Sequence, residues 1–286
     1  MIGVAKIGVS ARRGSGAAAP VNPDFVSTWN VASDGETVTL PLLSGGVYSG
    51  TIDWGDGGAT SSLSYANRAH VYATAGTYTI TISGSDIQGF RFANGGDKLK
   101  ITDISNFGNL TITTNQAFYG CANLFISATD APSITTTSVY RMFMAALNAN
   151  PLFTGIEYSS VTNFQGYSRG GSAGARSQFD NVNVSNYDMS SATNIRNMFR
   201  YGILDQDLSG WDITSVTDAL NFMEGSSGLS TANYDALLIG WAAQSVQTGV
   251  TIHFGGSQFT SGGAAEAAKT TLQTTYSWII TDGGSV

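Results

Sequence analysis

Cysteine and histidine are nearly absent from this sequence of 286 residues. Cys121 is the only cysteine, so an internal disulfide framework is excluded. A catalytic thiol needs a histidine partner, and the only two histidines are His70 and His253, neither of which we expect to pair with Cys121. Cys121 is therefore expected to be a small buried filler, as free cysteines usually are.

Charge is also scarce, and what there is has an acidic balance. Charged residues make up 12% of the chain, with 20 acidic and 13 basic residues and a net charge of −7. Without a basic stripe, we expect no nucleic-acid partner. No apolar run approaches the roughly 20 residues that a membrane span needs, so we expect no membrane insertion.

Motifs of enzyme chemistry are missing as well. The sequence contains no nucleophile elbow, phosphate loop or zinc spacing, and we expect no catalytic residues, no cofactor and no metal site. The run from Asp205 to Gly210 matches the first half of an EF-hand loop, but Val216 stands where a bidentate glutamate is required. Asp53 and Asp56 are also conceivable calcium ligands, although capping of their own turn is the favoured role.

What the chain has in abundance is glycine, 35 residues, within a composition that is 42% hydrophobic. This composition is typical of β-rich structure with many tight turns, and it argues against disorder and against a helical bundle. The predicted fold class is therefore mainly β with minor α.

A repeated unit organises the middle of the chain. Its copies are anchored at corresponding positions, which are Thr111, Thr136, Val161, Ala192 and Val216. Each copy carries an apolar pair, such as Met-Phe at 142–143 and 198–199, that should point inward. The period is roughly 25 residues, with one longer step before Ala192, and it is typical of a solenoid in which neighbouring units stack to bury one core. The Gly/Ser-rich segment 169–178 lengthens that copy and is expected to form a loop with a contact surface.

Two phrases within these repeats resemble a known family. Residues 117–124 read AFYGCANL, which resembles the BspA-type leucine-rich repeat with its A-F-x-G-C-x-N-L phrase. Residues 197–212 are similar to a related surface repeat, N-M-F followed by N-Q-D-L-S-x-W-D. The resemblance implies a leucine-rich-repeat solenoid, which we assign to residues 97–229.

The preceding segment has the alternating pattern of short strands with Gly-rich turns. Residues 52–57 (IDWGDG), 70–72 (HVY) and 76–80 (GTYTI) occur in the order of the motifs of a PKD domain, which the segment resembles apart from a shortened turn. The resemblance implies an immunoglobulin-like β-sandwich at 26–96 that acts as a spacer or adhesion module without a catalytic site.

The two ends have other patterns. Residues 1–25 read as an arm with too little apolar surface to fold alone, and either a frayed terminus or an assembly arm fits. The arm candidates are Ile2, Val4, Lys6, Ile7, Arg12 and Arg13. Residues 230–286 alternate between helical and strand patterns. A helix is expected after an N-cap at Ser230 or Thr231, followed by a strand over 250–254, a second helix over 264–276 and a closing strand over 278–280. This section predicts a small α/β cap on the repeats.

Exposed aromatic and basic residues beside Asn, Ser and Gln are candidates for a sugar- or protein-binding face. The candidate ligand-contact residues are Tyr158, Tyr167, Arg169, Arg176, Tyr187 and Tyr201. The alternative is that several of these tyrosines stack in the core of the repeats.

Both resemblances imply adhesion or recognition outside a cell. The segment 1–20 lacks the apolar stretch of a secretory signal, which favours a component of a bacteriophage virion. We expect a non-enzymatic capsid-decoration or tail-fibre protein, bound to other virion proteins by its arm and to a host surface protein or glycan by its repeats. Homo-oligomerisation would be common for a virion part. The alternatives are a bacterial cell-surface adhesin and, less favoured, a glycan-degrading enzyme.

Overall fold

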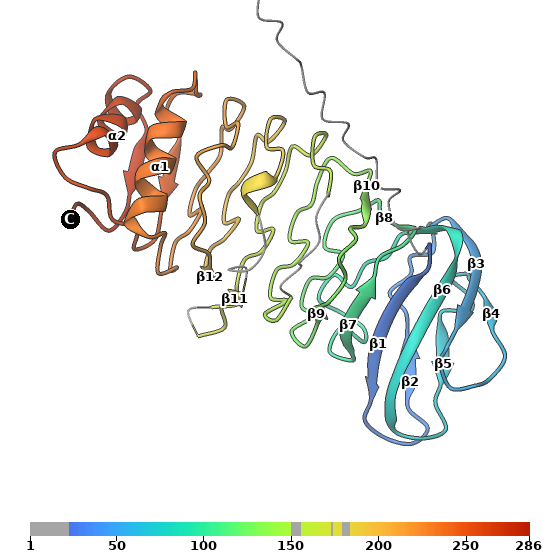
Figure 1. The fold of residues 1–286 in the computed structure, drawn as a ribbon. Coiled ribbons are helices and arrows are strands. Elements are labelled where there is room, and N and C mark those ends of the chain that lie inside the picture. Colours follow the sequence, from blue (N-terminus) through green and yellow to red (C-terminus); the bar gives the residue numbers. More distant parts are fainter. Residues whose placement is uncertain (1–22, 150–155, 173, 179–183) are drawn as a thin grey trace, which may run out of the picture.

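A computed structural model describes residues 23–149, 156–172, 174–178 and 184–286. The molecule is elongated: strands form one end, a row of stacked turns follows, and two helices lie at the C-terminal end (Figure 1). The described chain is mainly β with two α-helices, which confirms the predicted class at that level. The six candidate residues of the arm lie outside the described residues.

The strands are short except for β1 and β6, and their bounds are as follows: β1 Phe25–Val31, β2 Thr37–Thr39, β3 Tyr48–Asp53, β4 Ser61–Ser62, β5 Ala69–Val71, β6 Gly76–Gln88, β7 Ile101–Asn106, β8 Leu110–Ile112, β9 Phe125–Ile126, β10 Ser133–Ile134, β11 Ser177–Gln178, β12 Gly202–Ile203, β13 Thr251–His253 and β14 Ile279–Thr281. The helices are α1 Thr231–Ala242, α2 Ala264–Thr274 and a 3₁₀ turn, η1 Val184–Asn186.

The largest sheet joins the first strands to the repeats. β1 lies between β6 and β7 and is antiparallel to both. β3 also pairs with β6. Two strands of the repeats extend the sheet by parallel pairing, β8 with β6 and β9 with β7. Hydrogen bonding is therefore continuous across residue 97, where the sequence places a boundary between two units.

The N-terminal end has a second, small sheet formed by β2 and β5, and several of its aromatic residues are buried. Trp29 and Trp54 are buried, and the Trp54 ring stacks on the His70 ring with centroids 4.9 Å apart. The hydroxyl of Tyr72, also buried, donates to the Trp54 carbonyl at 2.7 Å. Thus Trp54, His70 and Tyr72, which belong to the first two phrases of the PKD resemblance, pack against one another.

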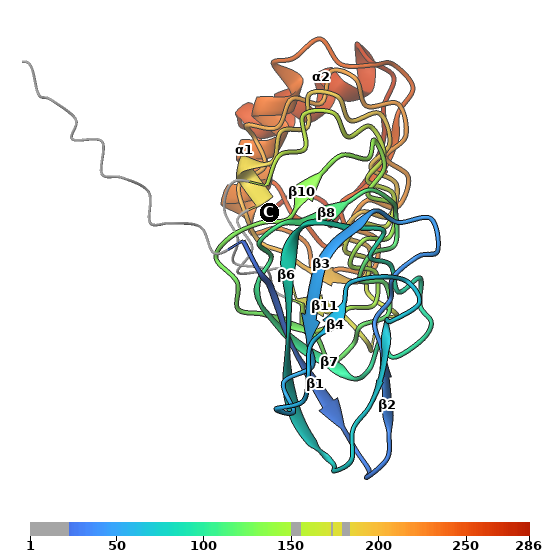
Figure 2. The ribbon, with the colours of Figure 1, turned by 90° about the vertical axis from the view of Figure 1, so that its right-hand side faces the viewer.

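The middle of the molecule is a row of turns joined by their backbones. Parallel bridges link Ser138 to Asn163, Asn163 to Asn194, and Asn194 to Asp218. The bridged residues hold corresponding positions in successive copies, so the row of turns has the period of the sequence repeat. Seen from the side in Figure 2, the turns lie behind one another.

A left-handed residue recurs at the same place in these turns. The equivalent residues, with their φ angles, are Gln116 (62°), Arg141 (54°), Gly166 (64°), Asn197 (55°) and Asn221 (59°). A residue with a side chain adopts this conformation at a cost of about 1–2 kcal/mol. The cost is offset because the reversed backbone keeps donating to the next turn, as at Arg141, whose N–H donates to the Gln165 carbonyl at 3.0 Å.

The inward-facing pairs of the repeats are buried as predicted. Met142, Phe143, Met198 and Phe199 are all at most 1% exposed. Phe143 stacks on Phe118 of the preceding turn with centroids 5.4 Å apart and an interplanar angle of 10°. Aromatic contacts of this kind run from turn to turn, so the core of the row is continuous.

The C-terminal section covers the last turn. Tyr234, Leu237, Leu238 and Trp241 of α1 are buried, and β13 pairs with β14 in parallel. The two predicted helices and two predicted strands of this section are confirmed. Ser230 occupies the N-cap position of α1 without making a side-chain cap hydrogen bond.

The long repeat contains a 3₁₀ turn and a Gly/Ser-rich turn. The apolar residues at 182–184 predict a short strand, of which 182 and 183 lie outside the described residues. At Val184 the prediction is wrong, because the 3₁₀ turn η1 begins there. The Gly/Ser-rich segment reverses direction, since the Gly171 N–H donates to the Ala175 carbonyl at 2.8 Å. It then enters β11, which pairs with β12 of the next repeat.

Replacing Phe143 with alanine should lower the free energy of unfolding by about 3–5 kcal/mol, since it leaves a cavity between two stacked turns. Urea denaturation followed by circular dichroism measures this change. The exposed Thr137, in the same repeat, provides the control, and Thr137→Ala should change stability by less than about 0.5 kcal/mol. Equal effects of the two substitutions would contradict the assigned packing.

Candidate ligand-binding face

Three arginines lie close together on the outside of the stacked turns. Ala145 N–H donates to the Arg169 carbonyl and Gly170 N–H donates to the Arg200 carbonyl, both at 2.9 Å. Arg169 and Arg200 therefore occupy equivalent positions in neighbouring turns. Arg141 belongs to the turn before that of Arg169. We call Arg141, Arg169 and Arg200 the arginine row.

The stems of two of these arginines run beside Gly166. At Gly166, an added Cβ atom would lie 3.4 Å from Cγ of Arg141 and 4.0 Å from Cβ of Arg169. Both distances are ordinary van der Waals contacts, so the two stems border the same backbone position. Gly166 also has a left-handed φ of 64°, which glycine adopts without the cost that other residues meet.

The charges of the row are only partly compensated. Nε of Arg200 lies 2.7 Å from Oε2 of Glu224. In the described part of the chain, neither Arg141 nor Arg169 has an ion pair, and Nε of Arg169 is buried without a hydrogen-bond acceptor. Partial burial, followed by the positive charges of Arg200 and Arg141, lowers the pKa of Arg169. A negatively charged group placed here would meet unpaired donors.

Tyrosine rings flank the arginines. The Arg141 guanidinium lies 4.6 Å from the ring centroid of Tyr140 and 5.8 Å from that of Tyr119. The Arg200 guanidinium lies 4.8 Å from the Tyr201 centroid, and its Nη2 donates to the Tyr201 hydroxyl at 3.2 Å. Cation–π contacts of this kind are worth about 0.5–1 kcal/mol at exposed sites, and they restrict where the guanidinium groups point.

Three of the six predicted ligand-contact residues are in the core instead. Tyr158 and Tyr167 are fully buried, and Tyr187 is 6% exposed. The hydroxyl of Tyr167 lies 2.5 Å from that of Tyr158 and 3.4 Å from that of Tyr187. Burial raises the pKa of all three. The expectation that they are exposed is wrong because their hydroxyls satisfy one another inside the stack.

The other three predicted contacts keep access to the surface. Arg169 and Tyr201 are half-buried and lie in or beside the arginine row, whereas Arg176 is half-buried and directly precedes β11. Arg141 and Arg200 were missed by the sequence reasoning. Aligning the copies on the anchors Val161 and Ala192 places Arg200 in the position of Arg169, one repeat away.

Residues with reactive side chains are committed to structural contacts. Cys121 is buried, and burial raises the pKa of its thiol. His70 Nε2 lies 2.7 Å from Oδ2 of Asp56, and His253 Nδ1 accepts a hydrogen bond from Gly255 N–H at 2.9 Å. Among the residues that the structure describes, no three His, Cys, Asp or Glu side chains gather as a metal site would require.

The carboxylates considered for calcium accept backbone hydrogen bonds. Asp53 accepts from Gly55 N–H at 2.9 Å, and Asp56 accepts from Gly58 N–H at 3.0 Å, which confirms the predicted capping role at this turn. In the repeats, Asp205 accepts a hydrogen bond from the backbone of Ser230 at 2.8 Å. Each of these carboxylates stabilises a turn or a contact between turns.

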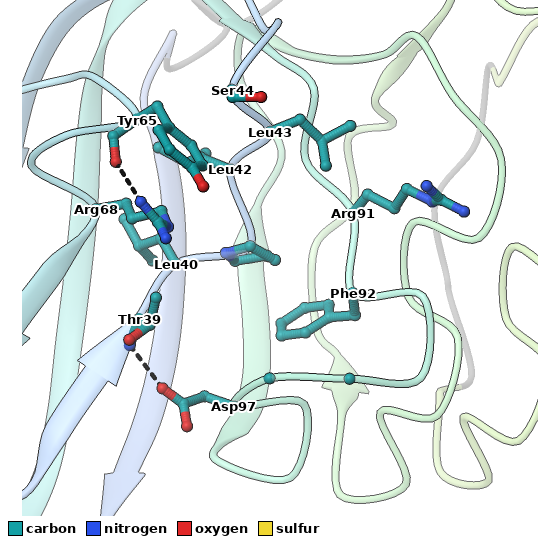
Figure 3. A pocket seen from close by; sticks show the side chains of 13 residues that line it. Thr39, Leu40, Leu42, Leu43, Ser44, Tyr65, Arg68, Arg91, Phe92 and Asp97 are labelled. Atoms are coloured by element: carbon teal, nitrogen blue, oxygen red, sulfur yellow. Dashed lines mark hydrogen bonds between the residues drawn. The ribbon is translucent and has the colours of Figure 1, made fainter.

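A pocket of about 280 Å³ lies where the strands meet the first repeat (Figure 3). Tyr65 and Arg68 line one side, with the guanidinium 3.7 Å from the ring centroid, and Phe92 points in from the other. Asp97 closes one end and accepts a hydrogen bond from Thr39 N–H at 2.6 Å. Arg68 and Asp97 are already engaged in contacts within the chain, and Arg91 donates to Gln116 although its Nε is buried without an acceptor. Because it brings three guanidinium groups together, the arginine row is the stronger candidate for ligand binding.

Comparison with known proteins gives one partial match. Residues 137–261 match a family model described as a Mycoplasma protein of unknown function, DUF285. This segment is less than half of the chain, and it contains the whole arginine row. No curated protein and no solved structure matches the chain. Among the described residues, no helix is both long and apolar enough to cross a membrane.

The contact between Asp56 and His70 predicts a pH effect on stability. The Gly58 N–H, followed by His70, holds the pKa of Asp56 below its ordinary value of 3.8. Because the folded-state pKa is the lower one, this stabilisation is present above about pH 4 and is lost as the pH falls through the folded pKa. Asp56→Asn should therefore lower the stability at pH 7. The difference in stability between this variant and the parent protein should become smaller as the pH falls towards 2.5.

Urea denaturation midpoints at pH 7, 4 and 2.5 measure this effect. Glu157, an exposed carboxyl group, provides the matched control as Glu157→Gln, whose difference from the parent protein should stay nearly constant with pH. A difference for Asp56→Asn that does not shrink at low pH would refute the role given to this carboxylate.

Proposed function

We propose that this chain is a non-enzymatic recognition protein that contacts a host-surface protein or glycan through the outer face of its stacked turns. The observation that carries the proposal is the arginine row. It concentrates positive charge with unpaired donors on a protein whose net charge is −7. Partial burial, followed by the positive charges of Arg200 and Arg141, lowers the pKa of Arg169, and a bound anion would offset the repulsion.

The proposal also includes a fold type for each of the two main sections of the chain. We propose that residues 97–229 form a leucine-rich-repeat solenoid, supported by the parallel bridges that recur once per copy. We also propose an immunoglobulin-like, PKD-type sandwich at 26–96, supported by the packing of Trp54, His70 and Tyr72. Such a unit would act as a spacer that holds the repeats away from an attachment point.

The absence of enzymatic activity is proposed from what the reactive side chains do. Cys121 is buried among apolar residues, where a thiolate nucleophile does not form easily. His70 is stacked on Trp54 and bonded to Asp56, so it is not poised to accept a proton from Cys121. A glycan-degrading enzyme stays an alternative, and hydrolysis of a surface polysaccharide by the purified chain would favour it.

We propose a bacteriophage virion as the location, either as a capsid decoration or as part of a tail fibre. The support is the resemblance of two segments to modules that proteins display at surfaces, together with an N-terminal arm suited to docking on other virion proteins. A bacterial cell-surface adhesin is the second candidate, because the same modules serve there.

Immunogold electron microscopy of phage lysates and of cells from the source tests the location. We expect an antibody against this chain to label particles, and the position of the label on head or tail then separates decoration from fibre. Labelling of cell envelopes alone would overturn the virion proposal and favour the adhesin.

The role of the arm is tested by deleting residues 1–24. If the arm anchors the protein, the shortened chain should fold but should be lost from purified particles, as measured by immunoblot. The control is the substitution Arg176→Gln, which changes charge in the repeats and should leave incorporation unchanged. Normal incorporation of the shortened chain would refute the anchoring role.

A further inference from the structure

We infer that the arginine row binds a linear polysaccharide that carries carboxylate groups at intervals along its chain. The inference rests on the proposed recognition function and specifies its ligand. It starts from the shared property of the three arginines, which is that they come from consecutive turns of one stack.

Geometry gives the direction of the ligand. Backbones joined by inter-strand hydrogen bonds lie about 4.8 Å apart. Arg169 and Arg200 hold equivalent positions in two such neighbours, and Arg141 reaches towards Arg169 from the turn before. Positive charge therefore repeats along the axis of the stack, and a ligand that meets all three arginines has to extend along that axis.

Unpaired donors indicate the chemical group. A guanidinium has five N–H donors in a planar fork that matches a carboxylate. Within the described residues, Arg141 and Arg169 have no acidic partner, and Nε of Arg169 is buried without an acceptor. A ligand carboxylate would accept hydrogen bonds from the guanidinium groups of the row and would offset the repulsion among the three arginines.

A peptide ligand is disfavoured by the backbone of the turns. Peptides that lie along a β surface add hydrogen bonds to free backbone groups. Here the N–H groups of Arg141, Phe143 and Ala145 already donate to the next turn at 2.8–3.0 Å. The face offers side chains instead, among them the half-buried rings of Tyr119, Tyr140 and Tyr201, and aromatic rings pack well against the C–H surfaces of sugars.

Nucleic acid is disfavoured by charge density. Duplex DNA carries one negative charge per roughly 1.7 Å of its axis. A protein with a net charge of −7 and three arginines in a row repels such a polymer beyond the row itself. A polysaccharide whose carboxylates are separated by whole sugar units matches the sparser spacing of the arginines.

Isothermal titration calorimetry of the full chain with polygalacturonate oligomers at low salt tests the inference. The methyl ester of the same oligomers is the uncharged probe. We expect binding to the acid form only, weakened as salt is added. Arg169→Gln should weaken it by about tenfold or more, because a hydrogen bond to a charged group is lost, and Arg141→Gln should have an effect in the same direction.

Arg68→Gln is the matched control, since it changes the net charge equally in the pocket beside Tyr65, away from the row. It should leave the affinity unchanged, and thermal unfolding of each variant checks that the fold is kept. Equal binding of the methyl ester, equal loss in Arg68→Gln, or tighter binding of polyglutamate or DNA of matched length would overturn the inference.

A parallel measurement separates this inference from the recognition function. Fluorescently labelled chain is added to bacterial cells with and without excess polygalacturonate. Binding to cells that the polymer displaces supports both proposals. Binding that the polymer leaves intact would retain the recognition function and overturn the acidic-polysaccharide ligand. Failure to bind either the cells or the polymer would overturn both.

Discussion

The backbone hydrogen bonds between neighbouring turns determine the rest of this structure. In one copy after another, alternate N–H groups donate to carbonyls of the next turn, as for Arg141, Phe143 and Ala145. A backbone held in this way directs the Met-Phe pairs into the core and leaves other side chains outside, and it accepts left-handed residues where the turn requires them. The apolar core and the outer face are both consequences of that ladder.

The sequence was informative wherever a pattern repeats or alternates. Repeat spacing located the bridged turns, the Met-Phe pairs identified the core, and the apolar spacing of Tyr234, Leu237 and Trp241 located α1. These signals depend on local periodicity, which survives in a single sequence. The continuity of the sheet through β1 could not be predicted, because it depends on pairing between segments far apart in the chain, such as Thr28 with Asp103.

The candidate site was predictable only in part. Tyrosine is amphipathic, so sequence alone could not decide whether Tyr158 and Tyr167 face water or each other, and the third member, Tyr187, settles it by completing a buried hydroxyl cluster. Arg169 was recognised by its residue type. Its neighbours in the row were not, because the row forms only when copies of unequal length are brought into register.

The position of β1 has a mechanical consequence. This strand pairs along its whole length with β6 and is bonded on its other side to β7, the first strand of the repeat section. Force applied to the repeats reaches the N-terminal end through hydrogen bonds that run across the direction of the strands, and bonds loaded together in that way have to break together. The join between the two ends of the molecule thus resists being pulled apart.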